Sequence, residues 1–129
     1  MEQEQHYQEQ YKLKRLIKKL QEAEGDGTSL ITLIIPAGKK IAEFNQMLTE
    51  EQSKAENIKD RVNRLSVIEA LVSTKEVLRS QKASTEKGLC VFVGKVKVPG
   101  QNNQTRKVKI VFEPFKEIKS KVYFCGDKF

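Results

Sequence analysis

The sequence predicts an α+β fold, in which a four-stranded, mainly antiparallel sheet is packed with helices. Apolar residues recur at helical spacing in three long segments, and runs rich in β-branched and aromatic residues form four shorter ones. One predicted strand lies between the first two helices and three follow the third, an order that suits a sheet with helices against it. The chain has 129 residues, of which 38% are hydrophobic, so we expect one domain over residues 1–129, with residues 1–10 frayed.

The first helix is expected from about Gln5 to Glu24. Its apolar face consists of Leu13, Leu16, Ile17, Leu20 and Ala23. The glycines at positions 25 and 27 end this helix, and the run Leu30–Ile35, closed by Pro36, is predicted to be a central strand. Because this run is almost continuously apolar, both of its faces should be buried, which calls for helices on either side of the sheet.

Two further helices are predicted to form an αα-hairpin. The first runs from Ile41 to about Glu51, and the second begins with Asn57 as its N-cap and ends near Ser80. The buried stripe expected on the second helix consists of Ile58, Val62, Leu65 and Val72, widened by Leu71 and Leu78. The residues expected to fall away from this stripe are Lys59, Asn63 and Lys75. The hairpin should expose its connector, which places Asn57-Ile58-Lys59-Asp60 at the tip.

The last third of the chain is expected to supply three strands. Two of them, Leu89–Val98 and Thr105–Phe112, flank an exposed hairpin turn at residues 101–104, and a short one lies within Lys119–Phe124. In the second of these strands Lys107 and Lys109 alternate with apolar residues, which indicates one buried and one solvated face.

The charge balance is compatible with an anionic partner. The formal net charge is +7, and 32% of the residues are charged. Cations crowd the expected start of the third helix, where a helix dipole favours anions, with only Glu56 and Asp60 to moderate them. These cations are Lys54, Lys59, Arg61 and Arg64. A cationic helix start suits phosphate.

The sequence does not indicate a membrane protein or an enzyme of a common class. No run is apolar enough to span a membrane, and the acidic, glutamine-rich start does not resemble a signal peptide, so we expect a cytoplasmic protein. Cys90 and Cys125 suit buried reduced thiols, and with His6 as the one histidine they do not suggest a metal site. Without a glycine-rich phosphate loop, a nucleophile elbow or a paired acid and base, we expect no cofactor and no enzyme activity.

Three motifs resemble those of one protein family. Asn57-Ile58-Lys59 resembles the Asn-Ile-Lys-Ser helix start of the eukaryotic class 1 peptide-chain release factor, and Gly27-Thr28-Ser29 resembles that family's Gly-Thr-Ser loop. Tyr123, Cys125 and Phe129 fit the three fixed positions of its Tyr-x-Cys-x-x-x-Phe motif. The resemblance covers the chain from about Lys12 onward. Gly27 also suits a helix end, Cys125 a small core residue and Phe129 a hydrophobic support.

The resemblance implies the N-terminal, codon-reading domain of that factor, cut from a longer multidomain protein. Such a domain recognises a stop codon of mRNA in the ribosomal decoding site, beside ribosomal RNA of the small subunit. Asn57 and Lys59 would approach the first uridine. The residues that would help to read or pack around the following purines are Glu51, Tyr123, Cys125 and Phe129, and Thr28 and Ser29 would line the same pocket. Among these, Cys125 and Phe129, together with Ile58, would mainly support the reading surface.

The family's Gly-Gly-Gln loop, which triggers hydrolysis of peptidyl-tRNA, has no counterpart here. Pro99-Gly100-Gln101 lacks the glycine pair. The resemblance therefore implies a monomeric domain that hydrolyses nothing itself. The family's class 2 GTPase partner would bind through other domains.

The connector departs from the family pattern. Where the family commonly has Thr-Ala-Ser-Asn-Ile-Lys-Ser, this chain has Lys54, Glu56 and Asp60 in place of three small hydroxyl residues. Similar changes occur in factors from lineages with reassigned stop codons, so we expect restricted reading that favours UGA. Two alternatives stay open: a generic single-stranded RNA-binding module, and an interaction domain for a partner other than nucleic acid that uses the face of Lys107 and Lys109.

Overall fold

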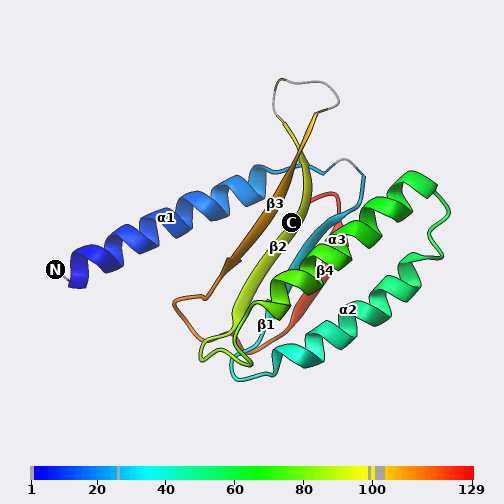
Figure 1. The fold of residues 1–129 in the computed structure, drawn as a ribbon. Coiled ribbons are helices and arrows are strands. Elements are labelled where there is room, and N and C mark those ends of the chain that lie inside the picture. Colours follow the sequence, from blue (N-terminus) through cyan, green and yellow to red (C-terminus); the bar gives the residue numbers. More distant parts are fainter. Residues whose placement is uncertain (1, 26, 99, 101–103) are drawn as a thin grey trace.

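A computed structural model of the chain describes residues 2–25, 27–98, 100 and 104–129, and the side chains from residue 8 onward. Its elements follow the predicted order of one helix, one strand, two helices and three strands (Figure 1). The helices are α1 (Glu2–Glu22), α2 (Ile41–Ala55) and α3 (Arg61–Arg79). The strands are β1 (Leu30–Ile35), β2 (Leu89–Lys97), β3 (Thr105–Phe112) and β4 (Val122–Gly126).

The four strands form one antiparallel sheet in the order β3-β2-β1-β4. The α+β fold predicted from the sequence is therefore confirmed. β1 lies between β2 and β4, with Leu33 opposite Val91 on one side and Tyr123 on the other. This central position explains why five of its six residues are buried. β3 and β4 are the edge strands of the sheet.

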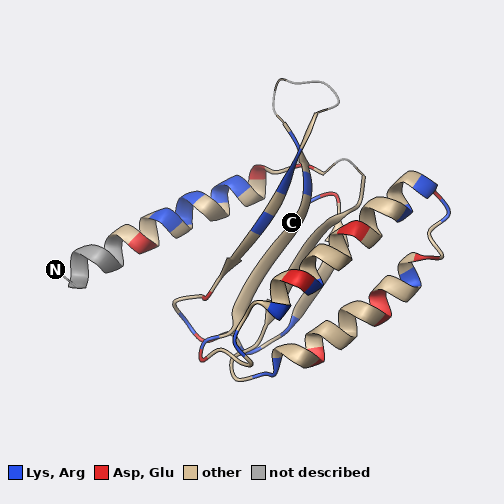
Figure 2. Cartoon of the chain, in the orientation of Figure 1, with Lys and Arg blue, Asp and Glu red and all other residues tan. Residues whose placement is uncertain are grey.

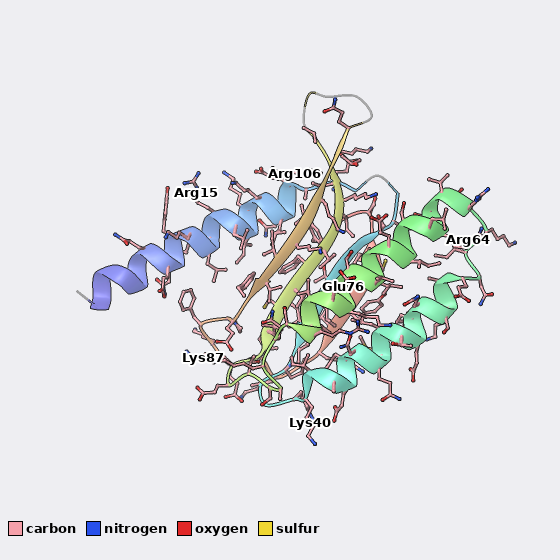
Figure 3. All side chains as sticks on the ribbon, in the orientation of Figure 1. Arg15, Lys40, Arg64, Glu76, Lys87 and Arg106 are labelled. Atoms are coloured by element: carbon pink, nitrogen blue, oxygen red, sulfur yellow. The ribbon has the colours of Figure 1, made fainter. Side chains whose placement is uncertain are left out.

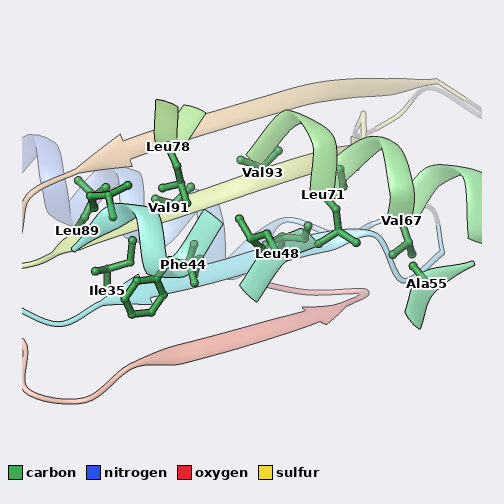
Figure 4. Close-up of a cluster of buried hydrophobic side chains, with 14 residues drawn as sticks. Ile35, Phe44, Leu48, Ala55, Val67, Leu71, Leu78, Leu89, Val91 and Val93 are labelled. Atoms are coloured by element: carbon green, nitrogen blue, oxygen red, sulfur yellow. The ribbon is translucent and has the colours of Figure 1, made fainter. Parts of the chain in front are cut away.

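The main core lies between one face of the sheet and the pair α2 and α3. Figure 4 shows its side chains pointing from the two helices and the sheet toward one another. β1 contributes Ile31, Leu33 and Ile35, whereas α2 contributes Ile41, Phe44 and Leu48. Because these two helices shield a single face, the predicted cover by helices on both sides is only partly realised. α1 leaves the sheet on the side away from α2 and α3 (Figure 1).

The predicted buried stripe of α3 is largely wrong. Val62, Leu65 and Val72 are exposed by 73%, 54% and 38%. The prediction holds for three other residues: Leu71 and Leu78 belong to the core, and Ile58 packs against it. The buried face consists of Val67, Ala70, Leu71, Ser73, Thr74 and Leu78. Small and polar residues thus take core positions that an apolar pattern does not reveal, and Thr74 satisfies its hydroxyl by donating to the carbonyl of Ala70 at 2.7 Å.

The connector between α2 and α3 lies further along the chain than predicted. α2 continues four residues beyond the expected end at Glu51, because Ala55 is buried in the core and the intervening polar residues tolerate a helix. α3 begins at Arg61 with Asp60 in the N-cap position, so the predicted N-cap at Asn57 is wrong. The connector therefore consists of residues 56–60. Gln101, Asn102 and Asn103 of the predicted β2–β3 turn lie outside the described residues.

The second face of the sheet carries an aromatic cluster. The ring of Phe92 stacks on Phe112 at a centroid distance of 5.9 Å and meets Phe129 edge-on at 5.6 Å. Phe92 alternates along β2 with the core residues Val91 and Val93, which places this cluster on the face away from α2 and α3.

Candidate functional site

An open hollow of about 380 Å³ lies where α2, the connector and α3 meet β4. The sequence-predicted residues that line it are Thr28, Glu51, Lys54, Ile58, Tyr123 and Cys125. They come from three segments separated by up to 97 positions in the chain. We call this space the first hollow. Its lining mixes hydroxyl, thiol and charged groups with the apolar side chains of Val67 and Leu71.

Thr28 is fixed from two sides. On one side, the Cys125 Sγ donates to its carbonyl oxygen at 3.2 Å. On the other side, Asn63 of α3 accepts from the Thr28 amide at 3.0 Å and donates through Nδ2 to the Thr28 hydroxyl at 2.7 Å. Helical periodicity predicts a free helix face for Asn63 and does not reveal this role. The residue type was a signal, because an amide can donate and accept at once.

Gly27 is required by the same contact. Its φ is +92°, and a Cβ there would lie 2.8 Å from the Asn63 Oδ1. Because α1 already ends at Glu22, the alternative role of Gly27 as the helix-ending residue is not realised. A residue without a side chain lets the segment turn and approach α3 closely.

The polar groups of β4 stay neutral near physiological pH. Burial raises the pKa of Tyr123 well above its usual value, and the neighbouring Cys125 and Glu51 add to this effect. Burial also raises the pKa of Cys125 to about 11, a hydrogen bond from Tyr123 lowers it, and the charge of Glu51 raises it. Tyr123 therefore presents a protonated hydroxyl and Cys125 a protonated thiol.

Glu51 supplies the carboxylate of the first hollow. Its Oε1 lies 3.3 Å from the ammonium group of Lys54, one helical turn further along α2. The Glu51 side chain is 27% exposed and that of Lys54 73% exposed, so the ion pair sits at the rim of the hollow. Any ligand that binds the Glu51 carboxylate must share it with Lys54 or displace that lysine.

The connector exposes Glu56, Asn57, Lys59 and Asp60 beside the first hollow. Ile58 points the other way, is half-buried and packs against the core. Arg64, labelled at this end of α3 in Figure 3, donates from Nη1 to the Ile58 carbonyl at 3.2 Å. The cation at this helix start thus braces the connector. Lys59 and Asp60 do not line the hollow, although Ile58 between Asn57 and Lys59 does.

Two predicted site residues lie elsewhere. Ser29 is buried, with 2% of its surface exposed, although it adjoins Thr28. Phe129 packs on Phe92, on the face of the sheet away from Tyr123 and Cys125. The structure therefore brings Thr28, Glu51, Tyr123 and Cys125 together, leaves Asn57 and Lys59 exposed outside the lining, and separates Phe129.

Within the described part of the chain, no three potential metal ligands of the Cys, His, Asp or Glu type cluster together. Across the same residues, none of the helices has the length and apolar content needed to cross a bilayer. The arrangement offers neutral donors, one carboxylate and exposed cations around an open hollow. This combination is typical of binding by hydrogen bonds and charge.

The fold and this hollow define a small α+β binding domain with a polar recognition surface. The sequence profile described as eRF1 domain 1 matches residues 8–129. The chain belongs to this family. The eukaryotic peptide chain release factor subunit 1 of Schizosaccharomyces pombe is 48% identical over 119 residues, which cover 92% of this chain and 27% of that protein. The subunit 1 protein of Oxytricha trifallax is 41% identical over 94% of this chain and 27% of its own length.

Solved structures share the fold. The archaeal translation termination factor aRF1 superposes with a TM-score of 0.79 at 26% identity, over 92% of this chain and 32% of that one. Another archaeal protein superposes with a TM-score of 0.83 at 26% identity, over the same shares. The chain spans about a quarter of the length of the curated relatives it matches.

Proposed function

We propose that this chain is the stop-codon-reading domain of a translation termination factor. The observation that carries the proposal is the convergence of Thr28, Glu51, Tyr123 and Cys125 in the first hollow, beside the exposed Asn57-Ile58-Lys59-Asp60 connector. Family membership supports it, because the matched relatives are named peptide chain release factors. The partners would be mRNA and small-subunit ribosomal RNA in the cytoplasm, with a class 2 GTPase bound through other domains.

A single-stranded codon suits the chemistry of the first hollow. Unpaired bases expose donors and acceptors on their edges, and proteins read such edges with short polar side chains. The Tyr123 hydroxyl and the Thr28 hydroxyl can each donate to base oxygens or ring nitrogens. The Glu51 carboxylate accepts from exocyclic amino groups, and Lys59 supplies a charge for a uridine oxygen or a phosphate. In this proposal the chain binds RNA, and hydrolysis is left to other domains.

Charged residues in the connector and at the end of α2 support a restricted codon specificity. Lys54 already pairs with Glu51 at 3.3 Å and so competes with any base amino group for the same carboxylate. Glu56 and Asp60 add carboxylates on the exposed side of the connector, where they repel phosphate. We therefore infer that the domain reads a restricted set of stop codons and favours UGA. Lys54, Glu56 and Asp60 would set this restriction.

A termination assay tests the function and its restriction together. The full chain would be joined to the remaining domains of the Schizosaccharomyces pombe relative, and peptide release measured on ribosomes halted at UAA, UAG and UGA. We expect release on UGA to exceed release on the other two. Replacing Lys54→Thr, Glu56→Ser and Asp60→Ser together should broaden reading.

The outcomes separate the alternatives. Equal release on all three stop codons contradicts the restriction and leaves the codon-reading role standing. Release independent of any stop codon, together with strongly salt-dependent binding of free single-stranded RNA, favours a generic RNA-binding module instead.

A further inference from the structure

The Thr28 hydroxyl in the first hollow can donate or accept hydrogen bonds, and its contact with Asn63 decides how it is used. A threonine hydroxyl carries one proton and two lone pairs, so its orientation depends on its partners. Thr28 is exposed and lines the hollow, whereas Asn63 is half-buried on α3 and does not line it. Asn63 thus bonds to a group that faces the ligand space without facing that space itself.

The backbone fixes the orientation of the Asn63 side-chain amide. The Thr28 backbone N–H can only donate, and it donates to the Asn63 Oδ1 at 3.0 Å. This bond leaves the Nδ2 group of Asn63 to meet the Thr28 hydroxyl, at 2.7 Å. Because the Nδ2 group can only donate, the Thr28 hydroxyl must accept. Gly27 keeps the arrangement possible, since a Cβ there would lie 2.8 Å from the Asn63 Oδ1.

A hydroxyl that accepts from Asn63 keeps its proton for another partner. The contacts of Thr28 within the described part of the chain leave this proton without an acceptor. Cys125 donates to the Thr28 carbonyl oxygen at 3.2 Å, so it holds the backbone and does not compete for the proton. Thr28 therefore presents to the hollow one proton to donate and one lone pair that can still accept.

We propose that Asn63 is a positioning residue that enables Thr28 to donate a hydrogen bond to guanine in a stop codon. At the exocyclic position of a purine, guanine O6 accepts hydrogen bonds and adenine N6 donates them. The free proton of Thr28 suits guanine O6, and its remaining lone pair suits adenine N6. Asn63 acts through Thr28 and touches no base. This inference rests on the proposed function, because it takes the ligand of the first hollow to be the codon.

Replacing Asn63 by aspartate tests this inference. A carboxylate has no proton to donate, so the Thr28 hydroxyl would donate to it and keep only lone pairs for the codon. The variant would be made in the chain joined to the remaining domains of the Schizosaccharomyces pombe relative, and peptide release measured on UAA, UAG and UGA. We expect release on UGA, UAG or both to fall roughly three- to tenfold relative to UAA, the effect of losing one hydrogen bond.

Two matched variants separate this effect from looser packing and from added charge. Asn63→Ala removes the amide and leaves the Thr28 hydroxyl free to donate, so release on each guanine-containing codon relative to UAA should stay unchanged, although this variant is the less stable one. Ser66→Asp adds the same charge to α3 at a residue that does not line the hollow, and it should also leave these ratios unchanged.

Each outcome bears on the inference. A fall of the same size in Asn63→Ala or in Ser66→Asp overturns it, because looser packing or added charge then explains the change. Unchanged ratios in Asn63→Asp, with release still dependent on a stop codon, overturn the inference and retain the proposed function. Failure of the unmodified protein to release peptide at any stop codon overturns both.

Discussion

Individual residues hold the Thr28 segment against α3 and β4. The Asn63 amide makes two hydrogen bonds to Thr28, and the Cys125 thiol makes a third. The sequence motifs identified Thr28 and Cys125 as parts of a site, but Asn63 lies outside the three motifs that resemble those of the family. Helical periodicity assigned it to a free face, because periodicity cannot detect a contact with a segment 35 positions away.

Removing the Asn63 amide should loosen Thr28. We expect Asn63→Ala to lower the free energy of unfolding by about 1–2 kcal/mol, because it breaks two hydrogen bonds at a half-buried site. Asn63→Asp should lose less, since a carboxylate still accepts from the Thr28 amide and can accept from the Thr28 hydroxyl once that hydroxyl rotates to donate. Urea denaturation measures the stability, and hydrogen exchange at the Thr28 amide reports the local bond. Unchanged exchange in Asn63→Ala would contradict this assignment.

Gly27 offers a matched comparison with Gly38. Both have positive φ, +92° and +75°, but a Cβ at Gly38 would meet nothing within 4 Å, whereas one at Gly27 would meet Asn63. Each substitution by alanine carries a backbone cost of order 1–3 kcal/mol. Gly27→Ala should cost more by denaturation, and adding Asn63→Ala should remove part of the difference. Equal losses at the two glycines would show that the close approach to Asn63 has no energetic weight.

The Cys125 thiol should react slowly until alkaline pH. Its pKa of about 11 leaves little thiolate near pH 8, and the Glu51 carboxylate contributes to the upward shift. In a Cys90→Ser background, Glu51→Gln should lower the pKa of Cys125, because one nearby negative charge is removed, and should speed alkylation at pH 9. The pH dependence of iodoacetamide labelling measures the change. A slower or unchanged rate would exclude Glu51 as a contributor.

At the scale of elements, order and type were predictable and the buried face of α3 was not. Four strands and three helices follow from apolar runs and periodicities. On α3, however, residues that could be buried recur at helical spacing on two faces. The face that packs against the sheet is the one that contains Ala70, Ser73 and Thr74. Small side chains permit close packing against β1 and β2, and this requirement becomes visible only when the sheet is in place. The longer α2 has a similar cause, since buried Ala55 anchors its final turn.

A pair of leucines on α3 tests which face is buried. Leu71 is 1% exposed, whereas Leu65 is 54% exposed. Leu71→Ala should lower the free energy of unfolding by about 2–5 kcal/mol, because it leaves a cavity in the core. Leu65→Ala should change it by no more than roughly 0.5 kcal/mol, since its contacts are mostly with water. Urea denaturation of both variants gives the comparison, and similar losses would contradict the assigned orientation of α3.

At the scale of the whole molecule, the fold gathers motifs that the sequence keeps apart. The family resemblance identified Thr28, Glu51 and Tyr123 as candidates, and the sheet order places β4 beside β1 so that these residues meet near the end of α2. Phe129 shares a motif with Tyr123, yet the chain turns after β4 and puts its ring on the other face. Residues of one linear motif therefore indicate family membership, but they need not lie close together in the structure.

Charge is also unevenly placed over the molecule. Figure 2 shows Lys and Arg on α1 and on the β2–β3 pair, and again where α2, the connector and α3 meet beside the first hollow. Lys95 and Lys107 lie directly opposite each other across this pair, and Glu69 of α3 contacts Lys95 at 3.2 Å. Like charges that face each other across strands are destabilising. Lysines also protect the edge strand β3 from pairing with other chains.

A salt series distinguishes protection of the β3 edge from binding of a partner. Lys107→Gln with Lys109→Gln removes two exposed charges from β3. If both lysines contact ribosomal RNA phosphates, ribosome affinity should fall and the slope of log affinity against log salt should decrease by about 2. Codon preference should not change, because these side chains do not line the first hollow.

The other outcomes are also informative. Weaker ribosome binding with an unchanged salt slope would indicate a protein partner at this face, and unchanged ribosome binding would indicate that the lysines only protect the edge strand. A change in codon preference would instead contradict the separation of the two surfaces, because it would mean that the first hollow responds to charge on the far edge of the sheet.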